Sequence, residues 1–501
     1  MVNYPQMIVN KPTGNTDSER YLSRVCNDTF LSLWTYPSPT KADGKELCDL
    51  LVVFRNSVII FSDKDCEFKN EVNIEIAWGR WYKKAIIKSA NQLYGAEREI
   101  IRNPDEVFLD KKKQTPFPLT IPQKEEIIIY RVAVARGAKD ACIKYHDGGS
   151  GSLMMLHTDG EAPSRPFTIC NSDFTKGFVH VFDETTFDIV LKTLDTITDF
   201  IDYLDKKEKF FADCEYLSYC GEEDLLAQYL CNLDEKEKHC FIANPEIQPK
   251  YRVHIEEGIW AEFRRKLQYG FQVPENNISY LWDTIIERFA YHIMNGTSRV
   301  VSNPDVASQS RIFSYLANES RLRRRNLAKS LIGILSKPAH KKNASDSVVK
   351  QRVVFPTSEG DPLYTFVVVG RTTNQSDDEY REHRMRYLEA YVQRTKLETA
   401  KDKSVIGIAI SNQYPEDSSE DIVLIDADNW DDEYKAEAEE TVKTFREAGM
   451  WNSKREFSHY TDYEYPSGSP QIKTYKGRDR NKPCPCGSGK KLKNCCLRSA
   501  L

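Results

Sequence analysis

Four cysteines close the sequence in an arrangement suited to a metal ion. One residue separates Cys484 from Cys486, and eight residues separate Cys486 from the adjacent pair Cys495 and Cys496. Four thiolates complete a tetrahedral shell, which is the usual coordination of a structural zinc ion. The Gly-Ser-Gly segment at 487–489 permits a tight turn between the two pairs. Because so short a segment has almost no core, zinc binding would supply most of its folding free energy.

Two other interpretations of the four cysteines stay open: unrelated thiols, or a redox switch built on the vicinal pair. The stretch DRNKPCPCGSGKKLKNCC closely resembles the SEC-C motif, named after the carboxyl-terminal tail of the SecA translocase ATPase. The resemblance implies zinc held by the four cysteines and docking to a protein partner, in some cases the ribosome. Lys490, Lys491 and Lys493 would add a basic face suited to acidic surfaces. The motif accompanies many unrelated proteins and does not name the activity of the remaining chain.

A second set of polar residues lies at the ends of two apolar runs near the start of the chain. The runs LCDLLVVF and SVIIF are separated by only two residues, a spacing that predicts a β-hairpin. Asp49 begins the first predicted strand and Lys64 ends the second, so a tight turn would bring both to one edge of a sheet. Glu19, on a preceding predicted helix, and Gln92, on a following one, are expected near the same edge.

This ordering resembles the PD-(D/E)XK nuclease family, which has a restriction-endonuclease-like fold, over about residues 15–140. The resemblance implies carboxylates that hold one or two Mg²⁺ ions, which lower the pKa of a bound water. On this resemblance Asp49 would be the first metal carboxylate and Lys64 the lysine that orients or activates the water. Glu19 would be an accessory acid, and Gln92 would lie near the metal or the phosphate.

The sequence departs from the nuclease pattern two residues before the lysine. The family has Asp or Glu there, whereas this chain has Ser62, and serine is a poor magnesium ligand. Asp63 is expected to point to the opposite face unless the strand bulges. Asp65 or Glu46 could take the place of the missing acid. The departure therefore concerns catalysis more than it concerns the fold.

The apolar patterns along the chain predict an α/β protein. We expect a restriction-endonuclease-like mixed sheet with flanking helices, a helical and α/β middle region, and a small C-terminal zinc knuckle. The predicted parts are a nuclease-like domain at 15–245, a mainly helical region at 246–345, a second α/β region at 346–456, a linker at 457–477 and the SEC-C motif at 478–501.

Three further segments carry specific expectations. Residues 187–211 have the periodicity of one long helix. The basic run at 321–329 could contact phosphates, but a solvated helix face is the favoured interpretation. Asp426 and Asp428 follow a predicted strand, where a carboxylate pair could bind metal, yet no lysine or histidine nearby supports that function.

Composition limits the broad class of protein. The chain has 501 residues, 29% of them charged, and a net charge of -5, so several globular units are expected. There is no apolar run of about eighteen residues and no basic-then-apolar leader, so neither a membrane span nor secretion is expected. Nine scattered cysteines then indicate reduced thiols in a cytoplasm, many of them buried. Neither a P-loop nor an HExxH zinc motif is present.

These features lead to two classes of function. The first is metal-dependent cleavage of nucleic acid, with the knuckle docking a partner or substrate, as would suit bacterial defence by analogy. The second is a non-enzymatic adaptor, or a ribosome- or chaperone-associated factor, that binds through the knuckle. Ser62 favours the adaptor, whereas Asp49 and Lys64 favour the enzyme. Whether the nucleic acid would be DNA or RNA stays open.

Overall fold

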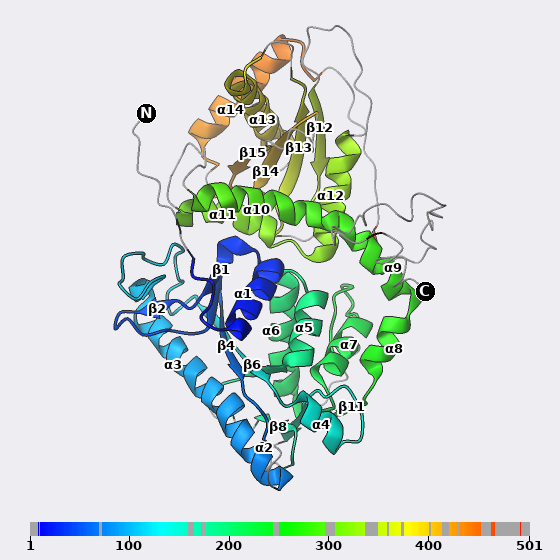
Figure 1. Cartoon of the computed structure of the whole chain (residues 1–501). Helices are drawn as coiled ribbons and strands as arrows, with labels where there is room; N and C mark the ends of the chain where they lie inside the picture. The colour runs from blue at the N-terminus through cyan, green and yellow to red at the C-terminus, as the bar shows by residue number, and fades with distance from the viewer. Residues whose placement is uncertain are drawn as a thin grey trace. The chain divides into compact units, whose positions relative to one another are not determined.

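The computed structural model divides the chain into two compact units (Figure 1). Unit 1 includes Met1–Val273 and Ile286–Arg321, and unit 2 includes Pro274–Ile285 and Leu322–Ser467. The residues that the structure describes are 9, 11–69, 73–158, 165–171, 174, 176–243, 250–295, 306–335, 349–357, 360–371, 375–399, 402–412, 420–428, 430–451, 462–465 and 491. Both units contain sheets and helices, so the predicted α/β class is confirmed. The five-part domain division stays a prediction.

The main sheet of unit 1 has five strands in the order β1-β3-β4-β6-β9. Its strands are β1 (Thr35–Pro37), β3 (Leu50–Phe54), β4 (Ser57–Asp65), β6 (Ile128–Arg136) and β9 (His180–Asp183). Strands β1, β3 and β4 are antiparallel, whereas β4, β6 and β9 are parallel. Phe54 pairs with Ser57, so the predicted hairpin with its two-residue turn is confirmed. Arg55 accommodates this turn with a left-handed φ of 54°.

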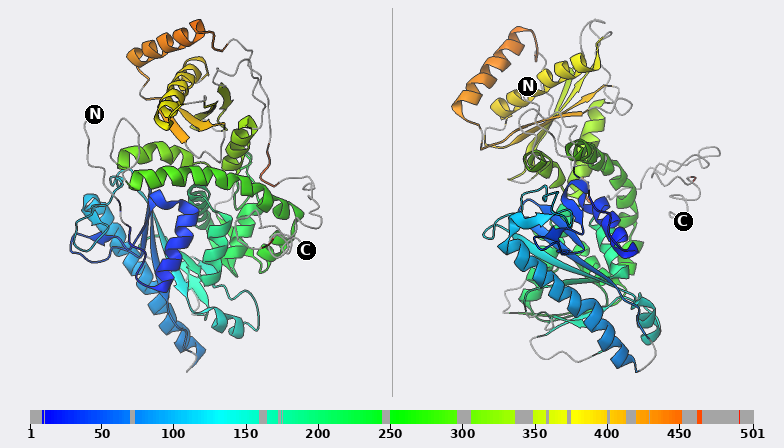
Figure 2. Two further views of the ribbon diagram at one scale, coloured as in Figure 1. Left: turned by 45° about the horizontal axis from the view of Figure 1, so that its top comes forward. Right: turned by 60° about the vertical axis from the view of Figure 1, so that its left-hand side comes forward.

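Helices cover both faces of this sheet. Helix α3 (Lys88–Arg102) lies along β4 and β6, as Figure 2 shows, while α1 (Asp17–Phe30) and α5 (Glu184–Thr193) contact the same sheet and each other. The helix predicted to carry Gln92 is α3, which is joined to α2 (Ile74–Tyr82) by a π-helical turn at Lys83–Ile87.

The long helical stretch predicted at 187–211 is present but interrupted. The chain forms α5 and then α6 (Ile197–Asp213), separated at Leu194–Thr196. The Thr196 side chain caps α6 by accepting the backbone N–H of Asp199 at 3.1 Å. An N-cap residue has non-helical backbone angles, so the chain is not helical immediately before α6. The apolar periodicity nevertheless continues across this break.

A second sheet in unit 1 has the order β11-β10-β7-β8. Its strands are β7 (Met154–Thr158), β8 (Thr168–Cys170), β10 (Cys214–Tyr219) and β11 (Tyr251–Ile255). Strand β11 pairs in parallel with β10, so the region predicted as mainly helical from residue 246 begins with a strand. Short strands β2 (Thr40–Lys41) and β5 (Val107–Phe108) form a separate pair. The remaining helices in this part of the chain are α4 (Lys139–Tyr145), α7 (Glu222–Cys231), α8 (Ile259–Arg265), α9 (Leu267–Asn276), α10 (Tyr280–Met294) and α11 (Val306–Ala317).

Unit 2 is built on a four-stranded sheet in the order β12-β13-β14-β15. Its elements are α12 (Arg321–Leu335), β12 (Val349–Val354), β13 (Leu363–Val369), α13 (Asp377–Thr399), β14 (Val405–Ser411), β15 (Glu420–Ile425) and α14 (Asp432–Glu447). Strands β13 and β14 are parallel and fully buried, with α13 packed on them. Asp426 accepts a hydrogen bond from Ser404 Oγ at 3.0 Å, which gives this carboxylate a structural role after the strand.

The basic run on α12 is not the solvated helix face that we predicted. Arg324 and Arg325 are completely buried. Arg324 Nη1 lies 2.7 Å from Asp283 Oδ1, and Arg325 Nε lies 3.1 Å from Asp462 Oδ2. A buried guanidinium is tolerated because carboxylates and carbonyls satisfy its donors. Arg324 and Arg325 therefore form their ion pairs inside unit 2.

Two class-level expectations can be compared with the described residues. No helix in this part of the chain is long and apolar enough to cross a membrane. The nine cysteines that the structure describes form no disulfide with one another, and six of them are buried, as predicted: Cys26, Cys48, Cys66, Cys142, Cys170 and Cys214.

A buried acid gives unit 1 a pH-dependent stability. Glu223 Oε1 accepts a hydrogen bond from Ser152 Oγ at 2.9 Å, and only 4% of the residue is exposed. Burial, followed by the negative charge of Asp183, raises the pKa of Glu223 from 4.5 to about 7. Between these two values the unfolded chain releases the proton first, so folding stability falls as the pH rises.

We therefore expect Glu223→Gln to stabilise unit 1 above pH 7. The amide keeps the bond from Ser152 but never ionises, which removes a penalty of about 3 kcal/mol. Thermal unfolding at pH 5 and pH 8 measures the effect: the variant should differ little from wild type at pH 5 and melt higher at pH 8. Glu235→Gln, at an exposed position, is the control. Equal melting of Glu223→Gln and wild type at pH 8 would contradict the assignment.

Candidate functional site

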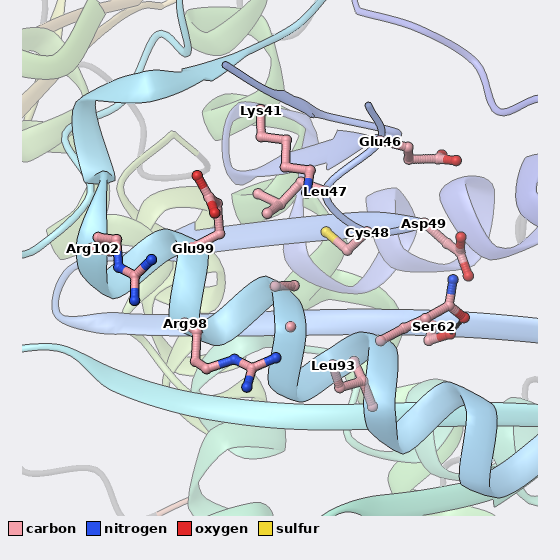
Figure 3. Close-up of a pocket in the computed structure, with 13 residues that line it drawn as sticks. Lys41, Glu46, Leu47, Cys48, Asp49, Ser62, Leu93, Arg98, Glu99 and Arg102 are labelled. Atoms are coloured by element: carbon pink, nitrogen blue, oxygen red, sulfur yellow. Dashed lines mark hydrogen bonds between the residues drawn. The ribbon is translucent and has the colours of Figure 1, made fainter. Parts of the chain in front are cut away.

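A polar cavity of about 560 Å³ lies in unit 1 beside the β3–β4 hairpin and helix α3 (Figure 3). The residues that line it are Lys41, Glu46, Leu47, Cys48, Asp49, Ser62, Gln92, Leu93, Gly95, Ala96, Arg98, Glu99 and Arg102. In the close-up, Glu46, Asp49 and Ser62 occupy one end of the cavity, and Arg98 and Arg102 occupy the other. Two of the four site residues predicted at the hairpin and helices, Asp49 and Gln92, are in this lining.

Asp49 is fixed in place by the hairpin. Its backbone N–H donates to Phe61 O at 3.2 Å, which extends the β3–β4 ladder by one residue. Its carboxylate Oδ2 accepts the backbone N–H of Asp63 at 2.6 Å and faces Lys64 Nζ at 3.4 Å. Only 10% of the Asp49 side chain is exposed, compared with 23% for Lys64. The predicted approach of Asp49 and Lys64 is therefore observed, and among the described residues nothing hydrogen-bonds to Asp49 Oδ1.

Alternation along β4 decides which side chains reach the cavity. Ser62 lies 3.4 Å from Gln92 Oε1 on α3. The next residue, Asp63, points to the other face as predicted, where its Oδ1 lies 2.9 Å from Arg136 Nε. Burial raises the pKa of Asp63, although the Arg136 guanidinium opposes the shift. No bulge turns the Asp63 side chain into the cavity, because β4 pairs with β6 in an unbroken register through this residue.

The other acids near the cavity are exposed or form hydrogen bonds outside it. Glu46 is exposed at the rim of the cavity. Partial desolvation and the negative charges of Asp49 and Glu19 raise its pKa, whereas a hydrogen bond from Ser38 lowers it. Glu19 serves the capping box of α1, since its Oε2 accepts the backbone N–H of the N-cap residue Thr16 at 3.4 Å, and it also accepts that of Asn15 at 2.6 Å. Asp65 is exposed at the end of β4. Within the described residues, no group of three or more His, Cys, Asp or Glu side chains could hold a metal ion.

The basic end of the cavity was missed by the sequence analysis. Arg98 and Arg102 are exposed on α3, and Lys41 approaches from β2. Their spacing of four residues places both arginines on one face of the helix, which was a readable signal. The sequence does not predict which segment faces that side of α3. Lys41 reaches it only because β2 pairs with the distant strand β5 in a separate sheet.

The oxygen donors at the acidic end fit magnesium in part. Mg²⁺ is commonly held by one or two carboxylates with several retained waters. Asp49 Oδ1 is available, and Glu46 is close enough to Asp49 to feel its charge. Gln92 Oε1 adds a neutral oxygen on the same side. The nuclease pattern has an acid at the position of Ser62. The cavity therefore offers one carboxylate fewer to a metal ion than that pattern implies.

The zinc ligands predicted at the tail, Cys484, Cys486, Cys495 and Cys496, lie outside the described residues. Residues 480–498 match the sequence profile of the SEC-C motif. The tail is a SEC-C motif. Protein translocase subunit SecA from Trichlorobacter lovleyi is 42% identical over 62 residues, which are 12% of this chain and 7% of SecA. The chain thus spans less than a tenth of the length of the curated relative that it matches, and no solved structure matches it.

Proposed function

We propose that this chain is a metal-dependent, nuclease-like protein that acts on nucleic acid and docks through its SEC-C motif. The observation that carries the proposal is that Asp49 and Gln92 line one polar cavity, while Lys64 Nζ lies 3.4 Å from Asp49 Oδ2. A pocket with a few convergent polar groups is the default hypothesis for a binding or active site.

The proposed chemistry uses each group at its observed place. Asp49 and Glu46 would hold Mg²⁺, which when bound lowers the pKa of a water and neutralises charge on the phosphate. Lys64 would donate to the attacking water or to a phosphate oxygen, since its ammonium already lies beside Asp49. Gln92 would position the phosphate or the metal from α3. Glu19 would act only indirectly, as an accessory negative charge near Glu46.

The order of elements in unit 1 supports a restriction-endonuclease-like fold. Helix α1 is followed by β1, β3 and β4, then by α3 and the parallel strand β6. The proposed site lies on the second and third of these strands and on the helix after them, at the positions that the resemblance implies. We keep 15–245 as the proposed limits of this domain.

A second candidate function is binding without cleavage. Ser62, together with the missing three-carboxylate cluster among the described residues, favours this adaptor. In either case we propose that the SEC-C motif binds zinc and recruits a protein partner or the ribosome, and that the protein acts in the cytoplasm. SEC-C motifs are typically zinc-binding, and four thiolates suit that ion.

Digestion of DNA and RNA by wild type and by Ser62→Glu separates the two candidates. The substrates are offered with Mg²⁺, with Mn²⁺ and with EDTA. We expect metal-dependent cleavage by wild type and about tenfold faster cleavage by Ser62→Glu, because the new carboxylate adds a ligand on the cavity side of β4. If neither protein cuts under any metal, the nuclease proposal fails and the binding function replaces it.

A further inference from the structure

We propose that Arg98 and Arg102 form a phosphate-binding subsite for the backbone of a nucleic acid duplex, which they contact without reading base sequence. The inference rests on the proposed function only in its choice of ligand. Binding at this subsite needs neither a metal nor cleavage, so its test is independent of catalysis.

The positive charges of Arg98 and Arg102 lie close together on α3, which is electrostatically unfavourable. Like charges four residues apart on a helix repel each other. Both side chains are exposed, and among the described residues no carboxylate forms an ion pair with either of them. The acid between them, Glu99, accepts instead a hydrogen bond from Asn103 Nδ2 at 2.9 Å. Two unneutralised guanidinium groups therefore face one cavity, where an anion would relieve their repulsion.

The helix surface beside the arginines leaves room for a backbone. Gly95 and Ala96 lie one turn before Glu99 on the cavity side, between Gln92 and the arginines. A Cβ atom placed on Gly95 would have no atom within 4 Å. A sugar–phosphate backbone can thus lie close to α3 along these small residues. It would run from the Asp49 end of the cavity to the arginine end (Figure 3).

The lining indicates which phosphate ligand fits. It contains no aromatic side chain, whereas proteins that bind single strands commonly stack bases on aromatic rings. A duplex keeps its bases stacked and presents only phosphates and sugars to such a surface. None of the large exposed apolar side chains lines the cavity, so it lacks the apolar contacts of a membrane-binding surface. Arginine forks match phosphate oxygens in geometry as well as charge.

Fluorescence anisotropy with labelled duplexes of unrelated sequences tests the subsite, in EDTA so that no cleavage occurs. We expect wild type to bind all of them with similar affinity. Arg98→Gln and Arg102→Gln should each weaken binding about tenfold and lower the slope of log Kd against log salt by about 0.9. Arg80→Gln, an exposed arginine on α2 outside the lining, should leave both quantities unchanged.

Several outcomes would overturn the proposal: no binding of duplexes by wild type, tighter binding of single strands, binding only to anionic phosphatidylserine vesicles, or equal losses in Arg80→Gln and the two subsite variants. Duplex binding that depends on Arg98 and Arg102 in a protein that never cuts would uphold the subsite and reject the nuclease function. Cleavage that persists without any loss in the two variants would uphold the nuclease and reject the subsite.

Discussion

Asp49→Asn is expected to lower metal-dependent cleavage about a thousandfold, because it removes the carboxylate on which the proposed Mg²⁺ site depends. The substitution is nearly isosteric. The amide oxygen can still accept the backbone N–H of Asp63, now 2.6 Å from Oδ2, so the hairpin should fold unchanged. What is lost is the negative charge that would hold the metal and that faces Lys64. Initial rates of plasmid and RNA digestion, over a range of Mg²⁺ concentrations, measure the effect.

Lys64→Ala should reduce the same rates by a smaller factor, on the order of a hundredfold, since it removes a proton donor but leaves the metal ligands. Asp140→Asn, at an exposed acid in the first turn of α4, is the matched control and should cut like wild type. Circular dichroism confirms that each variant is folded. Unchanged rates in Asp49→Asn would assign any cleavage to another site or to a contaminating nuclease.

Replacing Cys484 and Cys486 by serine is expected to reduce bound zinc from about one ion per chain to almost none. Two neutral hydroxyls cannot replace two thiolates, and zinc supplies roughly 10 kcal/mol or more of the folding free energy in such small sites. Zinc content is measured by mass spectrometry of the purified protein. Cys231→Ser, at an exposed thiol of unit 1, is the control that should keep its zinc.

The same double variant should lose partner binding. Co-sedimentation with ribosomes and capture of protein partners are compared for wild type, wild type treated with a zinc chelator, and the two cysteine variants. Binding that disappears with the chelator and with the double substitution would support docking through the SEC-C motif. Normal zinc content in the double variant would show that these thiols are not the ligands, and undiminished co-sedimentation would place the docking surface elsewhere.

Local features of the chain were predictable where local chemistry decides them. Two apolar runs with a two-residue gap can hardly form anything but a hairpin, and strand alternation then predicts that Ser62 and Lys64 share a face that Asp63 does not. The stretch DRNKPCPCGSGKKLKNCC alone carries the resemblance to the SEC-C motif. In both cases the residues that carry the prediction lie within a few positions of one another.

Two of the missed features depend on partners far away in the sequence. The arginines of α12 look like a solvated face because their partners are distant in the sequence: Asp283 lies 41 residues before Arg324, and Asp462 lies 137 residues after Arg325. The basic end of the cavity needs β2 and β5 to pair, which brings Lys41 toward α3. The break between α5 and α6 was readable, since the Thr196 and Asp199 pair is a helix-start signal inside an apolar periodic run.

The hydrogen bond from the Asp63 backbone to Asp49 ties the site to strand registry. A slip of one residue between β3 and β4 would turn Ser62 and Lys64 away from the cavity and bring Asp63 toward it. It would also separate the Asp49 carboxylate from the backbone N–H of Asp63. Molecules that pair these strands wrongly are thus expected to lack the close approach of Asp49 and Lys64, which forms only when the native hairpin is complete.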